Sequence, residues 1–297
     1  MRVVYSPHYR LDFGTHVFPT AKYHAVADRL TASGLVAPHG FVAPEAATWH
    51  DLALVHTSGY LAALASGTLS ADAQARLEIP CTPPIVEGFR LMTGGTVAAM
   101  RLALDGVDRT AVHLGGGFHH AFAGHGEGFC MFNDVAVAIR VAWRERLAGS
   151  AAVVDLDVHQ GNGTAAIFAG DPRVFTLSLH ETANYPDLKP PSSLDLGLDR
   201  GMGDDLYLRT LDDALGRVLE TLPDLVIYLA GADPYWDDQL GGLALTREGL
   251  RRRDRMVFEA ARSAGVPIVV LLAGGYARRF DDTVAIHTAT VEEAARA

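Results

Sequence analysis

The segment Asp155-Leu-Asp-Val-His159 follows the apolar run 151–154 and carries the residue types from which divalent metal sites are built. On an extended backbone successive side chains alternate faces, so Asp155, Asp157 and His159 point to one side. Two carboxylates and an imidazole at the end of a buried strand are costly to bury unless a positive charge lies among them. The segment therefore predicts a divalent metal site.

Asp233 follows another apolar run, Leu225–Ala230, and is the natural third ligand beside Asp157 and His159. Three protein ligands leave one coordination position open for water and substrate, which is typical of catalytic rather than structural zinc sites. Oxygen and nitrogen ligands without a thiolate also suit Fe(II) or Mn(II). Each Asp taken alone has a second interpretation, since Asp often caps the N-terminus of a helix.

Asp155 points the same way as the two ligands, and we interpret it as a supporting residue. It could orient a histidine or bind a monovalent cation. Ser178 lies at the end of the next apolar run and could share that cation through its hydroxyl, although an ordinary buried hydroxyl explains it equally well.

Two further motifs indicate hydrolytic chemistry. His119 and His120 follow 115-Gly-Gly-Gly-117, which lets the backbone turn sharply and bring both rings close to the metal. Two neighbouring imidazoles with different partners can hold different pKa values and divide acid and base work. Tyr276, after two glycines, can direct its hydroxyl at a developing oxyanion. Packed core side chains are the alternative interpretation of all three residues.

The pattern of apolar runs predicts the elements that position these groups. None of the six runs alternates cleanly between apolar and polar residues, which is typical of strands covered on both faces. Helix-length segments rich in Ala, Leu and Arg lie between them, and this alternation predicts an α/β fold with one open parallel sheet and helices on both faces. The predicted strands are Arg2–Tyr5, Thr110–Leu114, Ala151–Leu156, Val174–Leu179, Leu225–Ala230 and Pro267–Leu272; the predicted helices include Thr93–Leu104, Asn133–Leu147, Leu206–Thr221 and Thr246–Ser263.

The candidate chemical groups follow five of these predicted strands. Ligands of open α/β sheets bind beyond the carboxyl ends of the strands, so the five strand ends predict one active site at one edge. The proline-containing segment Asn184–Gly203 is interpreted as a long surface loop. Because we find no repeat, low-complexity tract or linker, we expect residues 1–297 to form a single domain.

Composition excludes several classes of function. The chain has 297 residues, of which 49% are hydrophobic and 20% charged, so it can bury a large core. A net charge of -10 argues against nucleic-acid binding and would suit a cationic or lysine-bearing substrate. With only Cys81 and Cys130, no disulfide framework is expected. No signal peptide and no apolar run long enough to span a membrane is recognisable, so we expect a cytoplasmic protein.

Together these residues resemble the histone deacetylase family of the arginase/deacetylase fold, and most closely its class IV members and their bacterial-type relatives. The resemblance extends over most of the chain, from Val3 to Tyr276. The motifs that carry it are Gly115-Gly-Gly-Phe-His-His120, Gly128-Phe-Cys130, Asp155-Leu-Asp-Val-His-Gln-Gly-Asn-Gly163, Asp233, Asp238-Gln-Leu-Gly-Gly-Leu243 and Gly274-Gly-Tyr276.

The resemblance implies a zinc-dependent amidohydrolase that removes an acyl group from a lysine side chain or a related amine. It implies Zn²⁺, with Fe²⁺ as an alternative, held by Asp157, His159 and Asp233. It further implies His120 as the general base, His119 as its partner imidazole oriented by Asp155, and Tyr276 as the donor that polarises the substrate carbonyl. A structural potassium ion would engage Asp155 and Ser178, and the substrate tunnel would be lined by Gly128, Phe129, Tyr185 and Leu240.

Asn162 departs from the pattern of class I members, many of which carry an Asp behind the general-base histidine. An Asn cannot supply a full negative charge, so His120 should be less readily protonated. The acyl group stays open among acetyl-lysine, acetylated polyamines, other small acylated amines and long-chain acyl-lysine; the class IV resemblance makes the last a serious candidate. The expected partner is therefore an acylated peptide, protein or small amine, and the oligomeric state cannot be predicted.

Two other functions compete with this interpretation. An arginase-like enzyme shares the fold but uses two metals, and the positions where its extra Asp ligands would stand hold Gly161 and Gly231. A catalytically inactive acyl-lysine-binding protein would be expected to lack the base, a metal ligand or the tyrosine, and this chain retains all of them.

Overall fold

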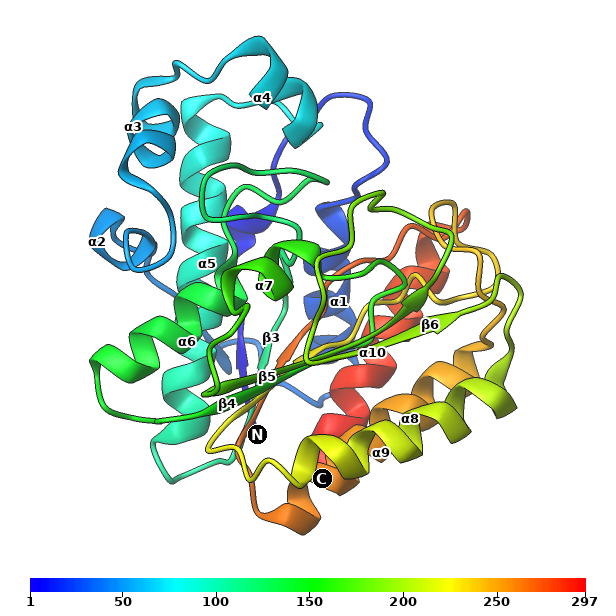
Figure 1. Ribbon diagram of the computed structural model, residues 1–297. Helices are drawn as coiled ribbons and strands as arrows, with labels where there is room; N and C mark the ends of the chain where they lie inside the picture. Colours follow the sequence, from blue (N-terminus) through cyan, green and yellow to red (C-terminus); the bar gives the residue numbers. More distant parts are fainter.

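Eight parallel strands form one sheet in the order β2-β1-β3-β8-β7-β4-β5-β6 in the computed structural model, which describes residues 1–297 (Figure 1). A parallel sheet needs a crossover between strands, and helices supply most of these crossovers. The prediction of an open parallel sheet is confirmed. The strands are β1 (Arg2–Val4), β2 (Phe41–Val42), β3 (Thr110–His113), β4 (Ala151–Asp155), β5 (Val174–Glu181), β6 (Leu194–Leu198), β7 (Val226–Leu229) and β8 (Ile268–Leu271).

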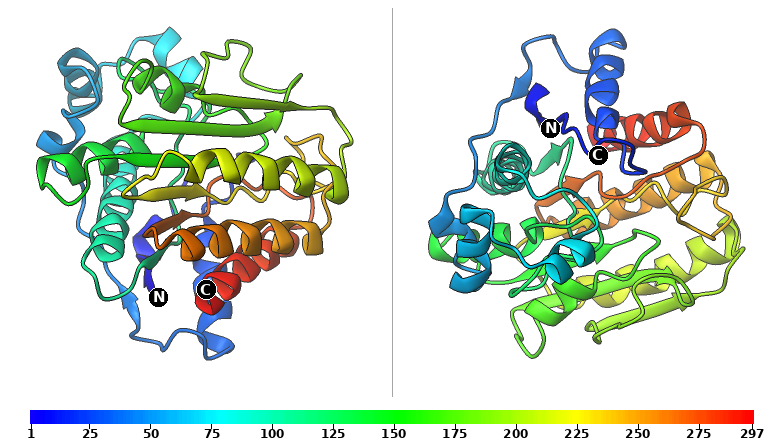
Figure 2. Two further views of the ribbon diagram at one scale, coloured as in Figure 1. Left: turned by 60° about the horizontal axis from the view of Figure 1, so that its bottom comes forward. Right: turned by 90° about the horizontal axis from the view of Figure 1, so that it is seen from above.

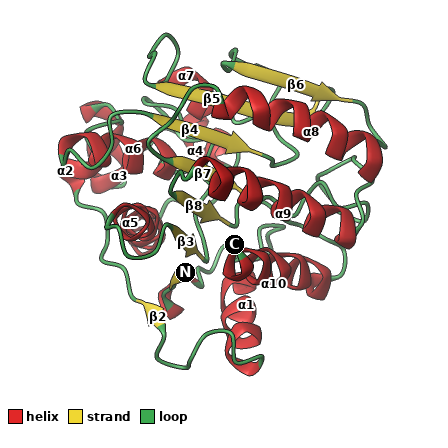
Figure 3. Cartoon of the chain, turned by 90° about the horizontal axis from the view of Figure 1, so that it is seen from below, coloured by secondary structure: helices red, strands yellow, loops and turns green.

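Helices cover both faces of the sheet (Figures 2 and 3). On one face α1, α10, α9 and α8 pack side by side, and on the other α5 packs against α6, with shorter helices around them. No helix is both long enough and apolar enough to cross a membrane. The helices are α1 (Ala21–Ala32), α2 (Trp49–Leu52), α3 (Ser58–Ser66), α4 (Ala71–Leu77), α5 (Pro83–Leu104), α6 (Asp134–Arg144), α7 (Asn162–Ile167), α8 (Asp204–Leu219), α9 (Arg247–Ala264) and α10 (Phe280–Arg296), with a 3-10 turn at Pro7–Tyr9.

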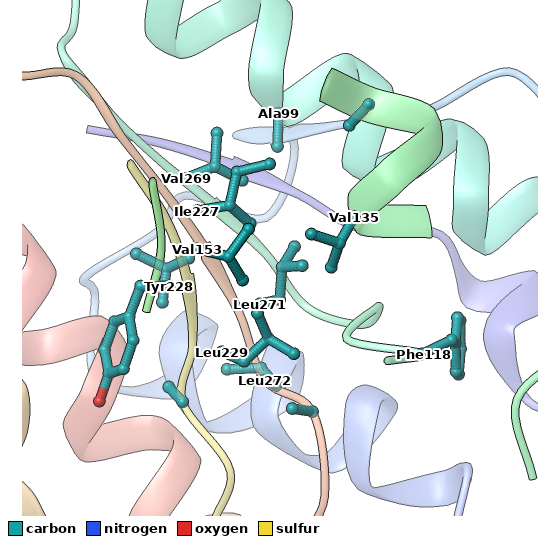
Figure 4. Packing of buried hydrophobic residues seen from close by; sticks show 14 of the residues in the cluster. Ala99, Phe118, Val135, Val153, Ile227, Tyr228, Leu229, Val269, Leu271 and Leu272 are labelled. Carbon is teal, nitrogen blue, oxygen red and sulfur yellow. The ribbon is translucent and has the colours of Figure 1, made fainter. Parts of the chain in front are cut away.

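The central strands bury side chains on both faces, as their unbroken apolar runs predict. Every residue of β4, β7 and β8 is buried. In Figure 4, Tyr228 of β7 points away from Ala99 of α5 and Val135 of α6, toward the opposite helical layer. Its hydroxyl donates a hydrogen bond of 2.5 Å to Asp254 of α9. The two-sided burial explains why a period-two pattern is missing from these strands.

Two expectations about elements need correction, and one strand was not predicted. The segment 184–203 is not all loop, because β6 forms there and pairs with β5 from Leu177 to Glu181. An edge strand is buried less completely, and β6 has the sequence Leu-Asp-Leu-Gly-Leu, which alternates instead of forming the unbroken apolar run used to identify the other strands. The two-residue strand β2 is too short to give a sequence signal. Helix α5 begins at Pro83 rather than Thr93, since Pro is well tolerated in the first turn of a helix.

Candidate active site

The strand order brings the predicted chemical groups together. Strands β3, β8, β7 and β4 are neighbours in the sheet, so the segments that follow them meet at one edge. They line a concave pocket that opens to solvent, as small-molecule sites do. His119, His120, Asp157, His159 and Tyr276 all line it.

Asp157, His159 and Asp233 form a cluster of potential metal ligands. One ligand atom from each residue lies within 4.8 Å of the others, and all three residues are buried. His159 Nδ1 lies 3.0 Å from Asp157 Oδ1 and 3.5 Å from Asp233 Oδ2. Asp233 Oδ2 is buried without a hydrogen-bond partner, whereas Asp233 Oδ1 accepts the Val158 N–H at 2.9 Å. A buried carboxylate oxygen with no donor is costly, and a metal ion would satisfy it.

The ionisation of this cluster shows how strongly it attracts a cation. Burial would lower the pKa of His159, but the hydrogen bond to Asp157 and the nearby Asp233 carboxylate raise that pKa to about 10. Burial, followed by the charge of Asp157, raises the pKa of Asp233 to about 7. A divalent cation among these groups would compete with the proton on His159, since metal ligands bind in their deprotonated form.

Two glycines leave room for the cluster. A Cβ atom on Gly274 would lie 1.9 Å from Asp233 Oδ2 and 2.5 Å from Asp157 Oδ2. A Cβ on Gly231 would lie 2.7 Å from Asp157 Oδ2. The Gly274 N–H instead donates a hydrogen bond of 3.0 Å to Asp157 Oδ2. The backbone of the β8 loop therefore approaches the carboxylates as closely as a side-chain donor would.

Replacing Gly274 with Ala should weaken metal binding by the cluster, measured with zinc, about 10- to 100-fold, the range seen when residues supporting metal ligands are altered. The new methyl group would have to displace both carboxylates, as the distances above require. Competition with a chromogenic chelator measures the affinity. Gly216→Ala in α8 is the matched control, because its Cβ would meet nothing within 4 Å. Equal zinc affinities of the two variants would contradict the prediction.

The paired histidines have different partners. His119 Nδ1 lies 2.7 Å from Asp155 Oδ2, and His120 Nδ1 lies 2.8 Å from Asn162 Oδ1. Both partners are acceptors, so each histidine carries a proton on Nδ1 and turns Nε2 toward the pocket. The two Nε2 atoms lie 3.1 Å apart.

Their environments also separate their pKa values. Burial lowers the pKa of His119, but Asp155 and Asp157 outweigh it and raise that pKa to about 9. Burial, with the neighbouring His119 and His159, lowers the pKa of His120 well below its ordinary value. Such a divergence between adjacent groups is the pattern that allows one to accept a proton while the other stays charged.

Asp134 is a site-supporting residue that sequence reasoning missed. Its carboxylate accepts hydrogen bonds from the N–H groups of Gly117 and Phe118, at 3.0 and 2.7 Å, and thereby fixes the turn that presents His119. Thr96 donates to the same carboxylate at 2.5 Å. Position 134 looks like an ordinary helix-start Asp in the sequence, because it begins α6. Its second role, as the acceptor for the glycine-rich turn, becomes visible only when the fold brings that turn to the start of α6.

Tyr276 is placed beside the cluster by its backbone and its ring. Its N–H donates a hydrogen bond of 2.7 Å to Asp238 Oδ2. Its ring packs edge-on against Phe129 and Phe18, with centroids 6.2 and 6.4 Å away. Burial, and then the charges of Asp157 and Asp233, raise its pKa, so the phenol stays protonated and can donate.

The four predicted tunnel residues all line the pocket. These are Gly128, Phe129, Tyr185 and Leu240, and sequence reasoning missed the lining residues Phe18 and Glu78. Phe18 precedes α1, far from any recognised motif, and stacks on Phe129 with ring centroids 6.2 Å apart. Phe129 has a φ of 66°, a left-handed conformation that few bulky residues adopt.

Asp155 and Ser178 are neighbours, being paired across β4 and β5. Ser178 Oγ hydrogen-bonds to His180 Nδ1 at 2.9 Å, while Asp155 Oδ1 accepts the Asp157 N–H at 3.2 Å. The two-metal alternative is disfavoured at position 161, because a Cβ on Gly161 would lie 2.3 Å from Asp155 Oδ2. An Asp at position 161, as that alternative requires, would have to displace the Asp155 carboxylate from its present place.

The fold and this pocket define an α/β protein with one buried cluster of potential metal ligands beside two histidines. The Histone deacetylase domain family matches residues 16–291. The chain belongs to the histone deacetylase family, whose members are amide-cleaving deacetylases that use a metal ion. The family resemblance predicted from the motifs is thereby confirmed.

Individual relatives agree with this assignment. The chain is 41% identical over 288 residues to an uncharacterized protein of Picosynechococcus, covering 96% of this chain and 95% of that one. It is 34% identical to Histone deacetylase 2 of Arabidopsis thaliana, covering 92% and 74%. It is 31% identical to a Histone deacetylase-like amidohydrolase of Pseudomonas aeruginosa, covering 84% and 70%. The crystal structure of the HDA15 HD domain shares the fold, with a TM-score of 0.79, 24% identity, and coverage of 98% of this chain and 90% of that one.

Proposed function

We propose that this protein is a zinc-dependent deacylase that removes an acetyl or longer acyl group from a lysine side chain or a related amine. The observation that carries the proposal is the meeting of three kinds of group in one pocket. Asp157, His159, the His119–His120 pair and Tyr276 line one pocket, and Asp233, which follows the neighbouring strand β7, completes the cluster of potential metal ligands beside His159. Membership of the deacetylase family supports an amide substrate.

The cluster fits zinc because it offers two carboxylates, one imidazole and one unpartnered carboxylate oxygen, with no thiolate. Fe²⁺ fits the same donors and is the alternative metal. When bound, the metal lowers the pKa of water toward about 7 and polarises a carbonyl. Asp155 and Ser178 are proposed to share a structural potassium ion behind this centre.

The protein's own residues then divide the proton transfers. His120, whose Nε2 faces the pocket, is proposed to take a proton from the attacking water. Tyr276 donates its hydroxyl hydrogen bond to the oxygen that becomes negative in the transition state. A histidine of the pair then protonates the leaving amine, and Asp155 keeps the His119 ring in its orientation. The aromatic walls Phe129 and Tyr185 hold the methylene chain of the amine and exclude water.

Two broader assignments accompany the proposal. We place the chain with class IV on its motifs, among them Gly115-Gly-Gly-Phe-His-His120 and Asp155-Leu-Asp-Val-His-Gln-Gly-Asn-Gly163. We also propose that residues 1–297 act as one domain, since a single sheet and one core cluster of 84 buried residues run through it.

A side-by-side assay tests the proposal. The zinc-loaded protein should hydrolyse an acetyl-lysine peptide, lose the activity to a chelator and regain it when zinc is restored. A myristoyl-lysine peptide and an acetylated polyamine, measured in parallel, rank the acyl chain and the amine. If none of the three is hydrolysed while zinc is bound, the chain is an acyl-lysine-binding protein rather than an enzyme.

A further inference from the structure

A carboxylate stands behind the amide that contacts His120. Asn162 accepts from His120 Nδ1 through its Oδ1 at 2.8 Å, and its Nδ2 donates to Glu127 Oε1 at 2.6 Å. Imidazole, amide and carboxylate therefore form one chain of hydrogen bonds.

The orientation of the Asn162 amide is fixed by an independent donor. Its Oδ1 also accepts the backbone N–H of Gly163 at 3.0 Å, and a backbone N–H cannot accept in return. The amide NH₂ must then face Glu127, which is an acceptor. The assignment of oxygen and nitrogen in this amide does not depend on His120.

Glu127 is held from two further sides. The Tyr185 hydroxyl donates to its Oε1 at 3.3 Å, and His125 Nε2 lies 3.2 Å from its Oε2. Its own carbonyl accepts the N–H of Cys130 at 2.9 Å, within the turn that presents Phe129. The Glu127 side chain is only 14% exposed, so solvent screens its charge weakly.

An amide between an imidazole and a carboxylate passes on part of the negative charge. Hydrogen bonds in such a chain polarise one another, so a carboxylate on the NH₂ side makes the amide oxygen a stronger acceptor. The Glu127 carboxylate thus carries the negative charge that Asn162 lacks, and it is connected to His120 through the Asn162 amide.

We propose that Glu127 is a positioning residue for His120, which it holds and polarises through the Asn162 amide. The inference rests on the proposed function, because it requires His120 to act in catalysis. Glu78 is the glutamate that lines the pocket itself and provides a comparison, since its side chain forms no hydrogen bond with Asn162.

The test moves the negative charge from position 127 to position 162. Glu127→Gln keeps an acceptor for the Asn162 NH₂ but removes the charge, and should lower kcat about tenfold with KM changed less than about twofold. Adding Asn162→Asp should restore kcat to within about threefold of the wild type. In the double variant the new amide at position 127 can donate to the new carboxylate at position 162, and the charge then lies beside His120. Thermal melting checks that the variants are folded.

A role limited to packing would not produce this rescue. A kcat of E127Q equal to that of the wild type, or no recovery in the double variant, would overturn the inference. An equal increase of KM in E127Q and in Glu78→Gln would also overturn it, because both carboxylates would then act directly on substrate binding through their charge. If His120→Ala, with Glu127 unchanged, left turnover at the wild-type rate, the proposed function itself would be refuted. The His120 Nδ1 proton resonance of the folded protein gives a second readout, and it should shift upfield in E127Q.

Discussion

Replacing His120 with Ala should lower kcat for the proposed acyl-lysine hydrolysis by about 10²- to 10⁴-fold, the usual contribution of a positioned general base. The imidazole lines the pocket and is held by the Asn162 amide at 2.8 Å. His119 lies beside it, but its pKa of about 9 makes it a poor base near neutral pH. The loss should therefore fall on kcat rather than on KM.

Zinc affinity and thermal stability separate this effect from damage to the site. Both should stay close to the wild type, because His120 is not one of the clustered metal ligands. His39→Ala, at an exposed histidine outside the pocket, serves as the matched control and should keep full activity. Turnover by H120A at the wild-type rate would refute the mechanism proposed above.

Replacing Tyr276 with Phe removes one hydroxyl and is expected to lower kcat by about 10²- to 10³-fold, as loss of an oxyanion donor does in other hydrolases. The ring would keep its contacts with Phe18 and Phe129, so the tunnel wall is preserved. KM should change only a few-fold, because the hydroxyl matters most when the oxygen becomes negative. Steady-state kinetics on the acetyl-lysine peptide separate the two constants.

Tyr5→Phe is the control for loss of a tyrosine hydroxyl elsewhere. Tyr5 hydrogen-bonds to His24 at 2.8 Å on the β1 side of the sheet, outside the pocket lining. The substitution should cost about 0.5–1.5 kcal/mol of stability and leave kcat intact. If Y276F kept more than half of the wild-type kcat, the oxyanion would need a different donor.

The parts of this protein that could be predicted from sequence are those with local signals. Buried parallel strands read as unbroken apolar runs, and the groups after them must meet at one edge, so the cluster of Asp157, His159 and Asp233 could be predicted before the strand order was known. The order of the strands itself could not be predicted, because it depends on crossovers of very different length.

The supporting residues could not be predicted because their signals are not local. Asp134 looks like a helix-start residue and Glu127 like part of a glycine-rich turn, yet each acts on a segment brought to it by the fold. Phe18 reaches the pocket from the chain before α1, without any motif. The edge strand β6 resembles a loop in sequence, because an edge strand lacks the continuous apolar run of the central strands.

The glycines around the cluster also constrain how this protein could have diverged. A second metal ligand at 161 would need a Cβ where Asp155 Oδ2 now stands, 2.3 Å away. Asp155 would have to be lost or moved first, and His119 would then lose its 2.7 Å partner. An Asp at position 161 is therefore expected to shift Asp155 and weaken its hold on His119, so this site exchanges a further metal ligand for an oriented histidine.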